Sequence, residues 1–216
     1  MGLASWRYIW RTTPVYRRDE AGSEADTPPP LPDGVSTDGV QRPQDGVGPL
    51  FHRRYRTWIC QSALSPEQLV DRIAGDPSSA APAEVALFRK QRGEQGQLRV
   101  GDEYLIRMPG PWDGPVRVVA RTPSSFRFAT LAGHLEAGQI EFGAQPDGSH
   151  VAFTIESWAT SGDRLAHLMY DRVGAAKEVQ LHMWMHFLGR TARLAGGRMT
   201  GGVDVQTHRL EGVGRD

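Results

Sequence analysis

The stretch that decides the fold runs from Gln139 to Leu194 and reads QIEFGAQPDGSHVAFTIESWATSGDRLAHLMYDRVGAAKEVQLHMWMHFLGRTARL. Residues 139–144 and 149–158 alternate apolar and polar side chains, and Asp147-Gly148 between them is typical of a tight hairpin turn. Residues 163–194 then repeat apolar side chains at helical spacing. A hairpin followed by one long amphipathic helix predicts a sheet whose apolar face that helix covers.

The residues before the hairpin predict the rest of this α+β domain. Two short helices are expected: residues 66–74, where Ser65 and Gln68 form a capping box, and residues 82–92, which end at Gly93. Alternating patterns predict further strands at residues 53–61, 98–108, 116–121 and 125–131, and a short last strand at Val203, Val205 and Thr207. This order predicts a curved antiparallel sheet with two short helices and one long C-terminal helix.

Composition divides the chain into two parts. Residues 1–50 are expected to be an extended or partly disordered N-terminal arm and linker, because residues 19–50 are rich in Pro, Gly, Asp and Ser. The arm also carries aromatic side chains interleaved with arginines between Ser5 and Arg18. Two interpretations stay open: the arm docks on the main domain or on a second chain as a homo-oligomer contact, or it is disordered. The folded domain is expected over residues 51–210.

Charge and cysteine content narrow the class of protein. The 25 acidic and 25 basic side chains cancel, which argues against a surface for nucleic acid over the whole protein. The single cysteine, Cys60, cannot form a disulfide within the chain. No apolar run reaches the 18 or more residues that a membrane span needs, and the first residues lack the apolar core of a signal peptide. We therefore expect a cytoplasmic protein without a membrane span.

The order of elements resembles the helix-grip superfamily, also called START-like or SRPBCC, which includes lipid-transfer domains, pollen-allergen-type proteins and polyketide cyclases. Residues 128–142, FATLAGHLEAGQIEF, are more specific. They match the pattern aromatic-x-Thr-Leu-x-Gly-His-x-Glu-x-Gly-x-x-x-Phe, and this resembles the hallmark of a bacterial and plant domain family of unknown function. The resemblance covers residues 52–195 and implies a cavity for an apolar small molecule; catalysis does not follow from it.

Strand parity and helix spacing select the side chains that would line such a cavity. The expected ligand-binding residues are Tyr104, Ile106, Trp112, Phe126, Phe128, His134, Phe142, Phe153, Met183 and Phe187. Charged residues of the same strands alternate out of phase with these and are expected on the opposite face as cross-strand Arg–Glu pairs. They are Arg107, Arg117, Arg121, Arg127, Glu103, Glu141 and Glu156.

His134 and Glu136 are the candidates for catalysis, and both are weak ones. An imidazole near a cavity mouth is able to move a proton near neutral pH, whereas the structural interpretation is that His134 braces the bend between two strands. A metal site is not expected: Glu178, His182 and His186 recur every four residues, but Met183 follows the first histidine where a zinc protease has glutamate. No motif predicts a cofactor.

The sequence thus predicts an uncharacterised protein that binds an apolar or amphipathic small molecule between sheet and long helix. Two alternatives stay open. One is an enzyme of cyclase or hydratase type that uses His134 with an acidic partner in the same cavity. The other is a non-enzymatic module that binds a partner or a second copy through the N-terminal arm.

Overall fold

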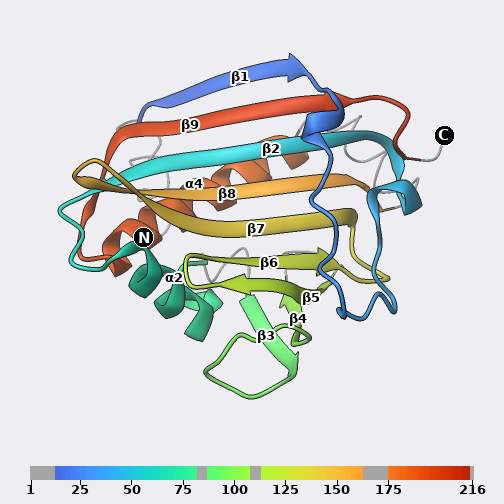
Figure 1. The fold of residues 1–216 in the computed structure, drawn as a ribbon. Helices are drawn as coiled ribbons and strands as arrows, with labels where there is room; N and C mark the ends of the chain where they lie inside the picture. Colours follow the sequence, from blue (N-terminus) through green and yellow to red (C-terminus); the bar gives the residue numbers. More distant parts are fainter. Residues whose placement is uncertain (1–12, 82–86, 108–112, 163–174, 215–216) are drawn as a thin grey trace.

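The computed structural model describes residues 13–81, 87–107, 113–162 and 175–214 of the 216-residue chain (Figure 1). These residues form one curved nine-stranded sheet and two α-helices, α2 (Pro66–Gly75) and α4 (Ala175–Leu194). The strands are β1 (Val15–Ala21), β2 (Val47–Cys60), β3 (Leu87–Arg92), β4 (Glu103–Arg107), β5 (Asp113–Thr122), β6 (Ser125–Thr130), β7 (Glu136–Asp147), β8 (His150–Ser161) and β9 (Arg198–Leu210). Within the described residues, the predicted α+β class with a large curved sheet is confirmed.

The sheet order is β1-β9-β2-β8-β7-β6-β5-β4-β3. Among these neighbours β1 and β9 pair in parallel, and the others pair antiparallel. The predicted hairpin is β7–β8, and Asp147 lies opposite His150 where it turns. The predicted last strand is confirmed as β9. It is longer than expected and lies between β1 and β2 in the sheet.

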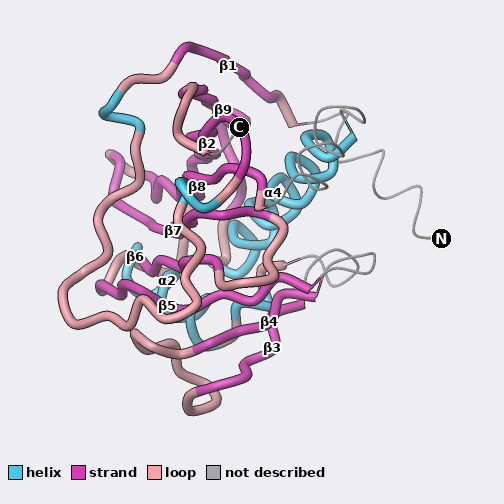
Figure 2. Tube along the Cα trace, turned by 90° about the vertical axis from the view of Figure 1, so that its right-hand side faces the viewer, coloured by secondary structure: helices cyan, strands magenta, loops and turns pink. Residues whose placement is uncertain are grey.

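Helices α2 and α4 cover one face of the sheet, which we call the inner face (Figures 1 and 2). On β2 the buried side chains Tyr55, Thr57 and Ile59 alternate with more exposed ones, so burial follows the two-residue period of a strand. Helix α2 begins as predicted, with Ser65 accepting from the Gln68 backbone N–H. The main hydrophobic core lies between this face and the two helices.

One of the two predicted short helices needs correction. Residues 87–92, expected in a second short helix, form β3 instead, and residues 82–86 lie outside the described residues. The reason is tertiary: β3 pairs with β4, and Phe88 packs on Phe128 with ring centroids 6.2 Å apart, which outweighs local helix propensity. Helix α4 is described over 20 residues, about 30 Å; residues 163–174 of the predicted helix lie outside the described residues. No described helix is long and apolar enough to cross a membrane.

Residues 22–46, between β1 and β2, form a strap across the other face of the sheet, which we call the outer face (Figures 1 and 2). The strap offers backbone carbonyls and the sheet supplies donors. Arg117 Nη1 donates to the carbonyls of Ser36 (3.0 Å) and Asp38 (2.8 Å), and Gln139 Nε2 donates to that of Pro29 (3.0 Å). Proline has no N–H to satisfy, so a proline-rich strap suits a face rich in arginine donors.

The arm and linker therefore include ordered structure in this chain. Residues 15–21 are the edge strand β1, and β2 crosses the expected boundary between residues 50 and 51. Arg18 Nη2 binds Asp204 Oδ2 on β9 at 2.8 Å. Residues 1–12, which hold most of the aromatic side chains of the arm, lie outside the described residues.

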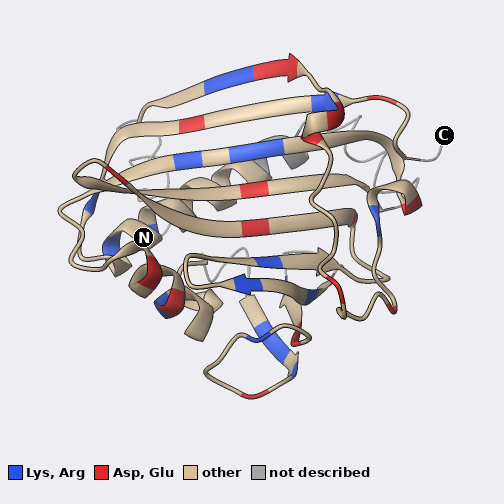
Figure 3. Ribbon diagram, viewed as in Figure 1, with Lys and Arg blue, Asp and Glu red and all other residues tan. Residues whose placement is uncertain are grey.

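Acidic and basic residues lie on neighbouring strands of the outer face (Figure 3). Two of the predicted cross-strand pairs are confirmed: Arg117 Nη2 lies 2.7 Å from Glu103 Oε1, and Arg127 Nε lies 3.9 Å from Glu141 Oε2. Their expected solvation is not confirmed. Arg117 and Arg127 are buried, because the strap lies over them and accepts their hydrogen bonds.

Candidate functional site

The inner face of β2 meets α4 through two successive pairs of side chains. Arg53 Nη1 donates to Gln180 Oε1 at 3.2 Å, and the rings of Tyr55 and Trp184 lie 6.4 Å apart between centroids. Arg53 and Tyr55 are two residues apart on a strand and share one face. Gln180 and Trp184 are four apart on a helix and also share a face. The four side chains therefore form two adjacent rungs between sheet and helix.

Two hydrogen-bond donors at these rungs have no acceptor in the part of the chain that the structure describes. Arg53 Nη2 and Trp184 Nε1 are buried and lack a hydrogen-bond partner among the described residues. The side chain of Arg53 is only 5% exposed, and its guanidinium lies over the Phe51 ring, 4.5 Å from the centroid. A buried donor without an acceptor costs about 1–3 kcal/mol, and a charged donor costs more. Arg53 Nη2 and Trp184 Nε1 are therefore available to additional hydrogen-bond acceptors.

The neighbours of Arg53 define the polarity of this region. Gln180 Nε2 donates to Glu136 Oε1 at 3.3 Å, so Gln180 links Arg53 to the start of β7. Burial raises the pKa of Tyr55 to about 12, and the charge of Arg53 opposes this rise only in part. The Tyr55 hydroxyl thus keeps its proton at neutral pH and is able to donate a hydrogen bond.

Six of the predicted wall residues lie together in the core and are nearly or fully buried: Tyr104, Phe126, Phe128, Phe142, Phe153 and Phe187. Their rings contact one another. Phe142 stacks on Phe126 with centroids 5.1 Å apart, and it lies 5.2 Å from Phe187 on α4. These rings form a packed apolar layer beside the two rungs, where Phe142 contacts Trp184. Their contact with a ligand stays a prediction.

The remaining predicted wall residues are placed differently. Ile106 and Met183 are partly buried and pack against the same core. Trp112 lies outside the described residues. A pocket of about 250 Å³ lies between the second half of α4 and the start of β9, where Met185, His186 and Met199 help to form it; no predicted wall residue that the structure describes lines this pocket.

His134 braces the turn before β7. Its Nδ1 accepts a hydrogen bond from the Glu136 backbone N–H at 2.9 Å, and the carboxylate of Glu136 is directed to Gln180. Burial lowers the pKa of His134 below its ordinary value of 6.5, and the nearby charge of Glu136 opposes this shift without cancelling it. The geometry therefore matches the structural interpretation of this histidine.

The lowered pKa of His134 gives a pH prediction with a definite sign. As the pH falls below 6.5, the unfolded chain binds a proton on this ring before the folded chain does, so stability falls. We expect wild type to lose more unfolding free energy than His134→Asn between about pH 7.5 and about pH 5.5. Urea unfolding of both proteins with a metal chelator present measures the difference. Equal losses would contradict the assignment.

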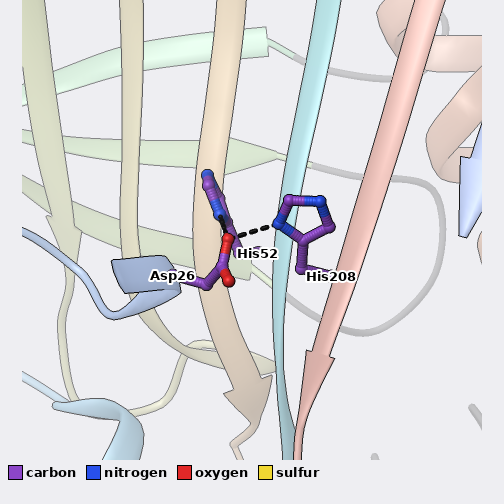
Figure 4. Close-up of side chains that lie close together, drawn as sticks. All are labelled: Asp26, His52 and His208. Carbon is purple, nitrogen blue, oxygen red and sulfur yellow. Dashed lines mark hydrogen bonds and ion pairs between the residues drawn. The ribbon is translucent and has the colours of Figure 1, made fainter. Parts of the chain in front are cut away.

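Asp26, His52 and His208 form a second polar cluster, on the outer face (Figure 4). Asp26 comes from the strap, His52 from β2 and His208 from β9, where the two histidines are cross-strand neighbours. Asp26 Oδ1 lies 2.8 Å from His52 Nδ1 and also contacts His208 Nδ1. Within the described part of the chain, this group brings three possible metal-binding atoms within 4.8 Å of one another.

The surroundings of this cluster fix its charges. Burial alone lowers the pKa of His52, but hydrogen bonds to Glu156 and Asp26 outweigh burial and leave the pKa above 6.5. Burial likewise raises the pKa of Asp26, yet hydrogen bonds from His208, His52 and Ser23 hold it well below its usual range. The His52 ring also stacks on Trp158, with centroids 5.2 Å apart and planes 12° apart.

Sequence reasoning missed both groups of residues for the same reason. Arg53 and His52 sit in a strand pattern that has no local motif, and their partners lie far away in the chain. Alternation marks Arg53 as a neighbour of Tyr55 on the inner face, and that was the one available signal. Asp26 lies in a Pro- and Gly-rich segment, where nothing in the sequence predicts docking on β2 and β9.

Comparison with protein families gives one match. The family described as "Domain of unknown function (DUF1990)" matches residues 80–190, about half of the chain. The matched range contains residues 128–142, on which the expected resemblance to a family of unknown function rests. No curated protein matches this chain.

Solved structures show likeness at low sequence identity. The di-domain ARO/CYC StfQ from the steffimycin biosynthetic pathway is 10% identical, covers 71% of this chain and has a TM-score of 0.51. This chain spans about half of that structure, 52% of its length. Ara h 8.0201 is 8% identical over 68% of this chain and 99% of its own, with a TM-score of 0.47. Ginseng major latex-like protein 151 from Panax ginseng is 15% identical over 62% and 94%, with a TM-score of 0.42. At 10% identity, the similarity to StfQ supports the fold alone.

Proposed function

This chain belongs to the DUF1990 family, whose function is unknown, and on that premise we propose that it binds an amphipathic small molecule with an acidic head group. The molecule lies between the inner face of the sheet and α4. Its head group accepts hydrogen bonds at the two rungs formed by Arg53, Gln180, Tyr55 and Trp184. Its apolar part follows the core.

The observation that carries this proposal is the buried guanidinium of Arg53. Its Nη2 lacks a hydrogen-bond partner among the described residues, and Gln180, which accepts from its Nη1, is neutral. A buried charge is normally compensated by an opposite charge. Among the described residues, Gln180 links Arg53 to Glu136, and an acidic ligand would supply a further acceptor to Arg53 Nη2.

The second unpartnered donor, Trp184 Nε1, explains why the head group is expected to have more than one oxygen. A carboxylate has two oxygens and about four acceptor positions. The apolar part is proposed to contact Ile106 and Met183, which are partly exposed, with the buried aromatic rings beneath them. Trp112 stays a predicted rim contact.

Titration with a twelve-carbon carboxylate and the alcohol of equal length tests the proposal. We expect wild type to bind the carboxylate about 10–100-fold more tightly, since a hydrogen bond to a charged group contributes about 1.5–3 kcal/mol. Arg53→Met should remove most of this difference. Isothermal titration calorimetry is a suitable readout.

Arg54→Met is the matched control, because Arg54 is the next residue of β2 and faces the strap side, where it binds Gln206. This variant should keep the preference for the carboxylate. An equal preference in wild type and Arg53→Met would contradict the role of Arg53. Failure of wild type to bind either amphiphile would contradict the proposed function as a whole.

The proposal does not extend to catalysis. His134 Nδ1 accepts from its own turn and the Glu136 carboxylate binds Gln180, so no observation favours a proton-transfer pair at the ligand. Binding of a second chain through the arm also lacks a favouring observation, because β1 pairs with β9 of the same chain.

A further inference from the structure

We propose that Asp26, His52 and His208 bind one divalent transition-metal ion, with Zn²⁺ the best fit, and that this ion fastens the strap to the outer face. The site is separate from the inner face and does not depend on the proposed ligand. Two imidazole nitrogens and one carboxylate oxygen are a donor set that zinc accepts in proteins, with solvent as a fourth ligand.

The placement of the three donors suits a single ion. Asp26 Oδ1, His52 Nδ1 and His208 Nδ1 all lie within 4.8 Å of one another. A tetrahedral ion bonded at about 2.0–2.2 Å to each donor holds the donors about 3.3–3.6 Å apart, so small side-chain shifts from the present contacts would admit it. The side chains are 12%, 13% and 27% exposed for Asp26, His52 and His208, so an ion reaches them from the surface.

The far nitrogens of both rings face carboxylates, as is usual for histidines that bind metals. His52 Nε2 lies 2.7 Å from Glu156 Oε1, and His208 Nε2 lies 3.9 Å from Glu20 Oε2. With the ion bound, each ring would keep its proton on Nε2, beside the carboxylate, and direct the lone pair of Nδ1 at the ion. Asp26 is oriented as well, because its Oδ2 accepts from the Ser23 backbone N–H at 2.8 Å and the Ser23 hydroxyl at 3.1 Å.

The ion would join three segments that are distant in the sequence. Asp26 belongs to the strap, and the two histidines belong to neighbouring strands β2 and β9. Because the unfolded chain does not hold these donors together, metal binding adds to the stability of the folded chain. The expected role is structural: the ion holds the strap over the sheet.

Zinc titration of the untagged full chain, after removal of metal with a chelator, tests the inference. We expect one Zn²⁺ per chain by competition with a chromophoric chelator, a higher Tm with Zn²⁺, and no binding of Mg²⁺, which imidazole does not suit. His208→Asn should bind Zn²⁺ more than about 100-fold more weakly, and Glu156→Gln, which keeps all three ligands, about 10–100-fold more weakly.

His150→Asn is the control, since His150 lies at the β7–β8 turn beside Ser149 and should not affect binding. Unfolding in chelator shows whether each variant is folded, and Glu156→Gln serves if His208→Asn is not. The inference is wrong if wild type binds no stoichiometric zinc, or if neither variant binds it more weakly than wild type and His150→Asn.

Discussion

Replacing Phe142 with alanine is expected to lower the free energy of unfolding by about 3–5 kcal/mol. The ring is 1% exposed, and it contacts Phe126, Phe128, Trp184 and Phe187 with centroids 5.1–6.3 Å apart. Alanine removes a ring that packs the sheet against α4 and leaves a cavity that its neighbours fill only in part. Urea denaturation followed by circular dichroism measures the change.

Val100→Ala is the control for this prediction. Val100 is 48% exposed, so its truncation should change stability by less than about 0.5 kcal/mol. A loss below about 1 kcal/mol for Phe142→Ala would show that the aromatic rings do not form the packed layer described here.

Gly138→Ala is expected to destabilise the chain by about 3 kcal/mol or more, because the added methyl group meets backbone. A Cβ at residue 138 would lie 1.9 Å from the carbonyl oxygen of Trp158 and 2.8 Å from the Cα of Ala159. Strands β7 and β8 would have to separate at this point. Chemical denaturation gives the change in unfolding free energy.

Gly143 lies on the same strand and provides a matched control. A Cβ there would lie 3.4 Å from the Cβ of Ser125, which is ordinary contact. Gly143→Ala should therefore be neutral or stabilise by up to about 1 kcal/mol, since glycine weakens a strand interior. Similar losses for the two variants would refute the steric explanation.

These two glycine positions also show how far the sequence predicts this fold. The motif of residues 128–142 contains Gly133 and Gly138, and the structure gives each a separate reason. Gly133 has a φ of +96°, which favours glycine, and Gly138 has no space for a side chain. Local signals of this kind also predicted the β7–β8 hairpin and the capped start of α2.

Elements that depend on distant partners were not predictable. Residues 87–92 become β3 because β4 lies beside them, and the strap is ordered because Arg117, Arg127 and Gln139 reach its carbonyls. The candidate sites were not predictable for the same reason. Arg53 stands out only once Gln180 on α4 is seen beside it, and His52 only once Asp26 of the strap and His208 of β9 are seen beside it.

Native mass spectrometry of the purified full chain tests the central claim, that the inner face binds an acidic amphiphile, most directly. We predict a complex that carries one small acidic molecule, either as purified or after incubation with the twelve-carbon carboxylate. Arg53→Met should appear mostly without it, and Arg54→Met should retain it. A wild-type chain that stays bare under both conditions, or equal occupancy in all three proteins, would contradict the account.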